Sequence, residues 1–190
     1  MSNTAVIILS SPRKGSNSSA LGRAVAQGLA RAGGLTETVD LSGLDLKPCL
    51  ACGNCQRNGG RCSQVDGMRT IYPKLRAASV LVLATPVYMF NMSAQLKIFL
   101  DRCFALMTPE HNEFTGKTMA AALSYGAEDL ASSGGGNILQ SLNDLCRYSG
   151  INWGGFIHGR GQDRDALAQN EDALEQARAF GAKLAGGSAG

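Results

Sequence analysis

Residues 5–19 read AVIILSSPRKGSNSS, and they indicate the class of fold. A short apolar run is followed by a polar turn, and then by a helical pattern with Leu21, Val25 and Leu29 on one stripe. A strand buried on both faces that leads through a turn into a helix is typical of a parallel α/β sheet. The free amides at the helix start, the turn's hydroxyl groups and Arg13 predict a phosphate-binding turn, and a plain helix-capping turn is the alternative.

The same alternation of strand and helix continues along the chain. Short apolar runs predict buried strands at 80–84, 118–123 and 151–157, whereas the alternating pattern at 35–41 predicts an edge strand. Helical patterns cover residues 18–32, 94–107 (with Ser93 as N-cap), 136–149 and about 163–185. These elements predict an α/β fold: a doubly wound, five-stranded parallel sheet of order 2-1-3-4-5 with helices on both faces.

Ligands of such sheets bind beyond the carboxyl ends of the strands, where the strand order reverses. The loop at 85–93 after the predicted third strand offers backbone amides, an aromatic ring and apolar side chains. These groups suit a flat heteroaromatic ligand, and a hydrophobic loop at a subunit contact is the alternative. After the fourth strand, Gly126 allows a ligand to approach the backbone closely.

Four of the six cysteines lie within residues 49–62, which read CLACGNCQRNGGRC. This spacing allows the four sulfur atoms to converge on a 4Fe-4S cluster. A tetrahedral zinc site and a loop of metal-free thiols remain as alternatives. The other two cysteines, Cys103 and Cys146, fall on apolar helical stripes and are expected to be free thiols in the core.

Composition excludes several classes of function. A net charge of +3 with 17% charged residues gives no basic stripe for nucleic acid, and no apolar run reaches membrane-spanning length. Without a signal-peptide pattern, we expect a cytoplasmic protein with a single domain at 1–190 and a cysteine-rich loop at 48–66. His111 and His158 are the only histidines, are expected on the surface or in loops, and indicate no acid–base catalytic pair.

Several motifs occur together in one order: SPRKGSNS at 11–18, PCLACGNC at 48–55, DGM at 66–68, PVY at 86–88, MSAQLK at 92–97 and Asp101-Arg102. In this combination the chain resembles the NADPH-dependent FMN reductase family, and more narrowly its iron–sulfur flavoprotein branch. The resemblance spans about residues 4–160 and implies a flavodoxin-like fold. Two positions depart from the family pattern. Ser10 replaces a glycine, which would narrow the turn, and Gly67 replaces an aspartate, which would alter a helix start.

The resemblance also implies the cofactor sites. The FMN phosphate would be held by Ser11, Arg13, Ser16, Asn17 and Ser18. The isoalloxazine ring would lie against Pro86, Val87, Tyr88, Met89, Phe90 and Asn91, with Ser124 and Gly126 behind it. The cluster ligands would be Cys49, Cys52, Cys55 and Cys62. No catalytic side chain is expected, because the flavin carries the chemistry.

Three functions are compatible with these features. In the first, an enzyme passes electrons from NAD(P)H through FMN to a quinone, a metal ion, a nitro compound or free flavin. In the second, an electron carrier takes electrons from a ferredoxin-like donor through the cluster to FMN. The third is a redox-sensing or metal-sensing module without turnover. Apolar residues near the predicted flavin, Tyr88, Met89, Phe90 and Met92, also predict a homodimer or homotetramer.

Overall fold

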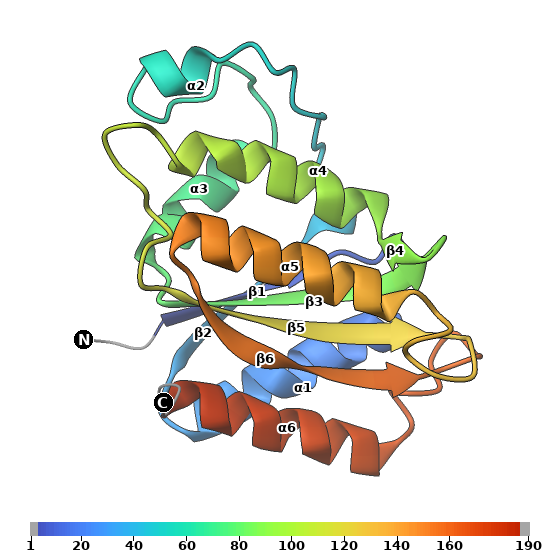
Figure 1. The fold of residues 1–190 in the computed structure, drawn as a ribbon. Coiled ribbons are helices and arrows are strands. Elements are labelled where there is room, and N and C mark those ends of the chain that lie inside the picture. Colours follow the sequence, from blue (N-terminus) through green and yellow to red (C-terminus); the bar gives the residue numbers. More distant parts are fainter. Residues whose placement is uncertain (1–3, 187–190) are drawn as a thin grey trace.

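The computed structural model describes residues 4–186, so the ends of the predicted domain at 1–3 and 187–190 lie outside the described residues. Its strands are β1 (Thr4–Leu9), β2 (Leu35–Asp40), β3 (Val80–Tyr88), β4 (Asn91–Met92), β5 (Thr118–Tyr125) and β6 (Asn152–Arg160). The parallel strands lie in the order β2-β1-β3-β5-β6, and β4 forms an antiparallel hairpin with the end of β3 (Figure 1). The predicted order 2-1-3-4-5 is confirmed, since β4 only extends β3.

The helices lie on both faces of the sheet, as predicted (Figure 1). They are α1 (Asn17–Arg31), α2 (Asn54–Arg57), α3 (Met68–Ala77), α4 (Ala94–Arg102), α5 (Gly135–Ser149) and α6 (Glu171–Ala185), with 3-10 turns η1 (Leu41–Gly43) and η2 (Cys103–Leu106). One core lies between the sheet and α1 and α6, the other between the sheet and α3, α4 and α5. The cysteine-rich segment, with α2, lies outside the α3 and α4 layer (Figure 1).

Strand β1 shows why the central strands are apolar throughout. Val6 and Ile8 are buried in the core under α3 and α4, and Ile7 and Leu9 in the core under α1. A strand that is covered on both faces gains about 1.5–3 kcal/mol from each large apolar side chain, whichever way it points.

The two outer strands differ in how well the pattern predicts them. Strand β2 is an edge, as predicted, although Leu41 already belongs to η1. The prediction that the last strand is buried on both faces is wrong, because β6 is the opposite edge and Phe156 is 38% exposed. The pairing with β5 shifts by one residue near Gly154 and Gly155, and Gly155 has a φ of +89°. The two glycines at this irregularity are the ones that interrupt the apolar run at 151–157.

Two helix bounds need correction, and helices α2 and α3 were not predicted. Helix α6 begins at Glu171 rather than near 163, because the side chain of Asn170 caps it by accepting a hydrogen bond from the N–H of Ala173 at 3.0 Å. The predicted helix at 94–107 ends at Arg102 and tightens into η2. The sequence analysis missed helix α3, although Met68, Ile71, Tyr72 and Leu75 form a buried stripe along it. The helices at 17–31 and 135–149 and the Ser93 cap match the prediction closely.

Within residues 4–186, the structure contains no helix with the length and apolar character needed to cross a bilayer.

Candidate functional site

The turn between β1 and α1 has its polar groups fixed by the fold. Ser16 is the N-cap of α1, and its Oγ accepts a hydrogen bond from the N–H of Ser19 at 3.3 Å. Ser11 Oγ accepts from the N–H of Arg13 at 3.2 Å. Gly15 turns the chain with a φ of +66°. Because the first N–H groups of a helix have no partner within it and lie at the positive end of its dipole, this turn is a candidate anion site.

Beside the turn lies a hollow of about 150 Å³ at the carboxyl ends of β3 and β5. Its lining includes Arg13, Ser16, Asn17, Pro86, Val87, Tyr88, Ser124 and Gly126, which the sequence had placed at the flavin. The Arg13 guanidinium lies 6.0 Å from the centre of the Tyr88 ring, within cation–π range. The structure therefore brings the polar β1–α1 turn and Tyr88, at the end of β3, together at this hollow.

The remaining predicted flavin residues are placed differently. Ser11 and Ser18 are buried in the turn rather than lining the hollow. Met89 and Phe90 form the tip of the β3–β4 hairpin and are 90% and 62% exposed. Asn91 faces a separate groove between α4 and α5.

Asn17 has a role that the sequence did not reveal. Its side-chain amide donates to the carbonyl groups of Gly161 at 3.2 Å and Asp163 at 2.7 Å, and its oxygen accepts from the N–H of Leu167 at 2.8 Å. The side chain thus fastens the β6–α6 loop over the hollow, which gains residues 161–164 as part of its lining. The partners are more than 140 residues apart, and no local pattern indicates such a contact.

Ser10, which departs from the family pattern, lies beneath the turn. Its hydroxyl donates to the carbonyl of Ala84 at 2.9 Å and lies 3.1 Å from the hydroxyl of Ser93. Ser10 is fully buried, so its side chain links β1 to β3 and to the start of α4.

Tyr125 is a further residue of the hollow that the sequence analysis missed. It is 7% exposed, and its hydroxyl lies 3.0 Å from Nδ1 of His158 on β6. Burial raises the pKa of Tyr125. Both His158 and His111 are exposed, as predicted.

The cysteine-rich loop forms a second candidate site. Cys49, Cys52, Cys55 and Cys62 all line one cavity of about 560 Å³, together with side chains of α4 and η2. Between the first cysteines, Ala51 and Gly53 take left-handed conformations with φ of 50° and 67°. Within residues 4–186, no group of three or more Cys, His, Asp or Glu side chains is close enough to hold a metal ion without rearrangement. The four thiols therefore share a cavity without converging on one point.

The surroundings of Cys52 shift its pKa in the opposite direction to those of Cys103 and Cys146. Hydrogen bonds from the N–H of Asn54 and from the Ser63 hydroxyl lower the pKa of Cys52, which favours a thiolate. Burial instead raises the pKa of Cys103, and that of Cys146 to about 11. Cys103 and Cys146 are buried free thiols, as predicted.

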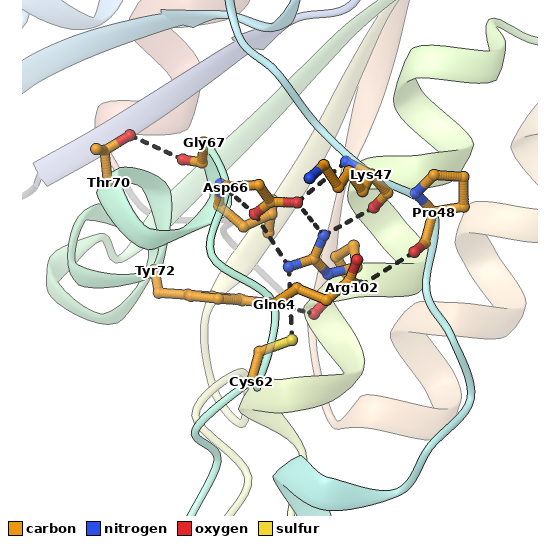
Figure 2. A network of polar contacts seen from close by, with 10 residues as sticks. Lys47, Pro48, Cys62, Gln64, Asp66, Gly67, Thr70, Tyr72 and Arg102 are labelled. Atoms are coloured by element: carbon orange, nitrogen blue, oxygen red, sulfur yellow. Dashed lines mark hydrogen bonds and ion pairs between the residues drawn. The ribbon is translucent and has the colours of Figure 1, made fainter.

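A buried ion pair adjoins the cysteine cavity (Figure 2). The side chains of Arg102 and Asp66 are 1% and 0% exposed and pair through both carboxylate oxygens. Burial alone would raise the pKa of Asp66, but hydrogen bonds from Arg102 and from the N–H groups of Lys47 and Met68 outweigh it, so the pKa stays below its usual value. The guanidinium also donates to Sγ of Cys62 at 3.5 Å.

A doubly wound parallel sheet in the order β2-β1-β3-β5-β6, with a hollow at the switch point, has the flavodoxin-like fold. Residues 4–153 match the family described as NADPH-dependent FMN reductase, and the chain belongs to this family of oxidoreductases.

Known relatives agree with this assignment. An iron-sulfur flavoprotein of Methanosarcina thermophila is 36% identical over 144 residues, which covers 76% of this chain and 73% of that protein. A second iron-sulfur flavoprotein, from Archaeoglobus fulgidus, is 34% identical over 166 residues, covering 84% of this chain and 83% of that protein. The structure of an NAD(P)H:quinone oxidoreductase from Methanothermobacter marburgensis superposes with a TM-score of 0.72 at 21% identity, covering 97% and 100% of the two chains. That last likeness shows the shared fold.

Proposed function

We propose that this oxidoreductase binds FMN in the hollow beside the β1–α1 turn and passes electrons from NAD(P)H to a small acceptor. One observation supports this most directly: the anion-binding helix start opens on the same hollow as Tyr88 and the carboxyl ends of β3 and β5. A phosphate and a flat ring can be bound there together.

In this proposal the chain binds and orients the cofactor. The N–H groups of the turn, the Ser16 hydroxyl and Arg13 would hold the phosphate, and the backbone from Pro86 to Tyr88 would lie along the ring. The small hollow suits the phosphate end, so the ring would rest on the rim near Tyr88. FMN supplies the hydride and one-electron chemistry when bound. A single anion site favours FMN over a dinucleotide.

The phosphate contact can be tested with two flavins. We expect Arg13→Gln to weaken FMN binding about tenfold, because a charge-assisted hydrogen bond contributes about 1.5–3 kcal/mol, less where solvent screens it. Binding of riboflavin, which has no phosphate, should hardly change. Arg23→Gln, on the exposed side of α1, is the matched control. Equal losses for both flavins would refute the assignment of Arg13 to the phosphate.

The electron donor is tested by anaerobic stopped-flow absorbance. The enzyme proposal predicts rapid bleaching of bound FMN by NADPH or NADH, followed by reoxidation with quinone, ferric chelate or nitro compound. Slow bleaching by both nucleotides would contradict it.

We further propose that Cys49, Cys52, Cys55 and Cys62 hold a 4Fe-4S cluster. The donor set fits, because all four thiols line one cavity. Ala51 and Gly53, in left-handed conformations, turn the backbone between the first three cysteines. The loop would need to rearrange to bring the sulfur atoms together. Anaerobic purification with iron, sulfide and zinc assays distinguishes the cluster from zinc and from free thiols.

If the cluster is present, a carrier function becomes the second candidate. The cysteine-rich loop lies outside the layer of α3 and α4 (Figure 1), and Cys49 and Cys52 are exposed, so a one-electron partner of the ferredoxin type could reach the loop. Fast reduction by such a donor with slow reduction by NAD(P)H would favour this function.

The exposed hairpin tip supports the proposal of a homodimer or homotetramer, which sedimentation equilibrium tests.

A further inference from the structure

Arg102 lies at the end of α4, and its side chain contacts Cys62, one of the residues that line the cysteine cavity (Figure 2). Its guanidinium donates to the carbonyl of Lys47 at 2.7 Å, to Asp66 and to Sγ of Cys62. Lys47 and Asp66 flank the cysteine-rich loop at its two ends, and the N–H of Lys47 also donates to Asp66 at 3.0 Å. One buried side chain therefore joins both ends of the loop and one of its sulfur atoms.

A role in stability alone does not account for the contacts of Arg102. Buried ion pairs can often be replaced by apolar side chains without loss of stability. Here Nε of Arg102 is buried and has no hydrogen-bond partner among the described residues. A terminal nitrogen of the same guanidinium donates to Sγ of Cys62. A buried donor without a partner is unfavourable, so pairing with Asp66 alone does not explain why an arginine occupies this place.

We propose that Arg102 is a positioning residue for the 4Fe-4S cluster: its hydrogen bond to Cys62 and its charge raise the cluster's reduction potential, and Asp66 limits how much of that charge the cluster experiences. This inference rests on the proposed cluster. The physical reason is that reduction by one electron adds a negative charge to the cluster, and a nearby positive charge or a hydrogen bond to a ligand sulfur favours the reduced form.

The proposal predicts shifts of opposite sign for the two partners. In anaerobically purified protein with measured iron, sulfide and FMN, Arg102→Gln should shift the cluster midpoint potential to more negative values. Asp66→Asn should shift it to more positive values, because the carboxylate no longer offsets the arginine. Arg102→Lys keeps the charge and should lie between wild type and Arg102→Gln. The potential is measured by redox titration followed by electron paramagnetic resonance.

Arg178→Gln is the matched control. Arg178 is also a buried arginine paired with acidic side chains, but it lies on α6, on the other side of the sheet. Its replacement should reduce stability and leave the cluster potential unchanged.

The outcomes separate this inference from the proposed function. Wild-type protein that takes up no iron and sulfide refutes the cluster, and the inference with it. A cluster whose potential is unchanged in the Arg102 and Asp66 variants, or shifts in the same direction in both, refutes the inference and leaves the cluster intact. Loss of the cluster from all three variants, with retention in Arg178→Gln, indicates a structural role only and also overturns the inference.

Discussion

The β1–α1 turn and the cysteine-rich loop are built in opposite ways. In the turn, Ser11 and residues 16–19 are buried, and serine hydroxyl groups form hydrogen bonds with neighbouring backbone and side chains. In the loop at 48–66, only Gly60 and the side chain of Asp66 are buried, and the four-residue helix α2 buries no residue. The turn is shaped by the two cores of the sheet, whereas the loop is held at its ends by Arg102 and Asp66 and in its middle by a hydrogen bond from Gln56 to the carbonyl of Phe104.

This difference separates two kinds of site. The turn is organised by folding itself, so its geometry should not depend on a ligand. The loop has little buried apolar surface, so its final arrangement should depend on what its thiols bind. The four predictions that follow test this contrast, beginning with the largest effect.

Cys55→Ala should abolish the proposed cluster and leave the proposed flavin site unchanged. The loss of one thiolate removes a ligand that the loop cannot replace, so iron and sulfide content should fall to background while FMN content stays at the wild-type level. Cys146→Ala, in the core under α5, is the control and should keep both cofactors. Loss of FMN along with the iron would mean that the two sites do not fold independently.

Asn17→Ala should damage the flavin site through the loop that it fastens. The variant loses three hydrogen bonds, which we expect to lower the free energy of unfolding by about 2–3 kcal/mol. FMN affinity should also fall, because residues 161–164 lose their support. Urea denaturation and flavin fluorescence titration measure the two effects. Asn143→Ala, which loses one bond within α5, should change both much less.

The hairpin tip beside the hollow contains backbone strain that a substitution should relieve. Met89 has a φ of 47° and is 90% exposed, so Met89→Asn removes little packing and places a residue that tolerates this conformation. We expect a gain of about 0.5–1 kcal/mol in the free energy of unfolding, measured by urea denaturation. Leu50→Asn, at an exposed position in the cysteine-rich loop, should give no gain. Equal effects would show that the strain is absent.

The smallest effect concerns alkaline pH. Burial raises the pKa of Tyr125 in the folded protein, so its stabilising contribution is complete below the pKa of the unfolded state, about 10, and is lost as pH rises through the folded pKa. Tyr125→Phe should therefore lose less stability than wild type between about pH 9 and 11. Tyr148→Phe, at a side chain that is 78% exposed, should follow the wild-type curve. Denaturant midpoints across this pH range distinguish the two.

Local patterns in the sequence predicted a large part of the fold. The apolar runs of β1, β3 and β5 and the stripes of α1 and α5 have the periods of their structures, since burial on one or both faces requires those periods. Patterns failed where a tertiary contact replaced the local preference. The predicted start of α6 was early because Asn17 holds residues 163–167 in a loop.

Sequence patterns alone predicted the parallel strands, the helices α1, α4, α5 and α6, the polar turn before α1 and the set of clustered cysteines, because these follow from periodicity and from residue types at close spacing. The folded arrangement was needed to see that Asn17 fastens a loop from the far end of the chain, that Tyr125 lines the hollow, and that Arg102 reaches Asp66 and Cys62. Such contacts join residues that are distant in the chain, and they exist only when the packed sheet and helices bring those residues together.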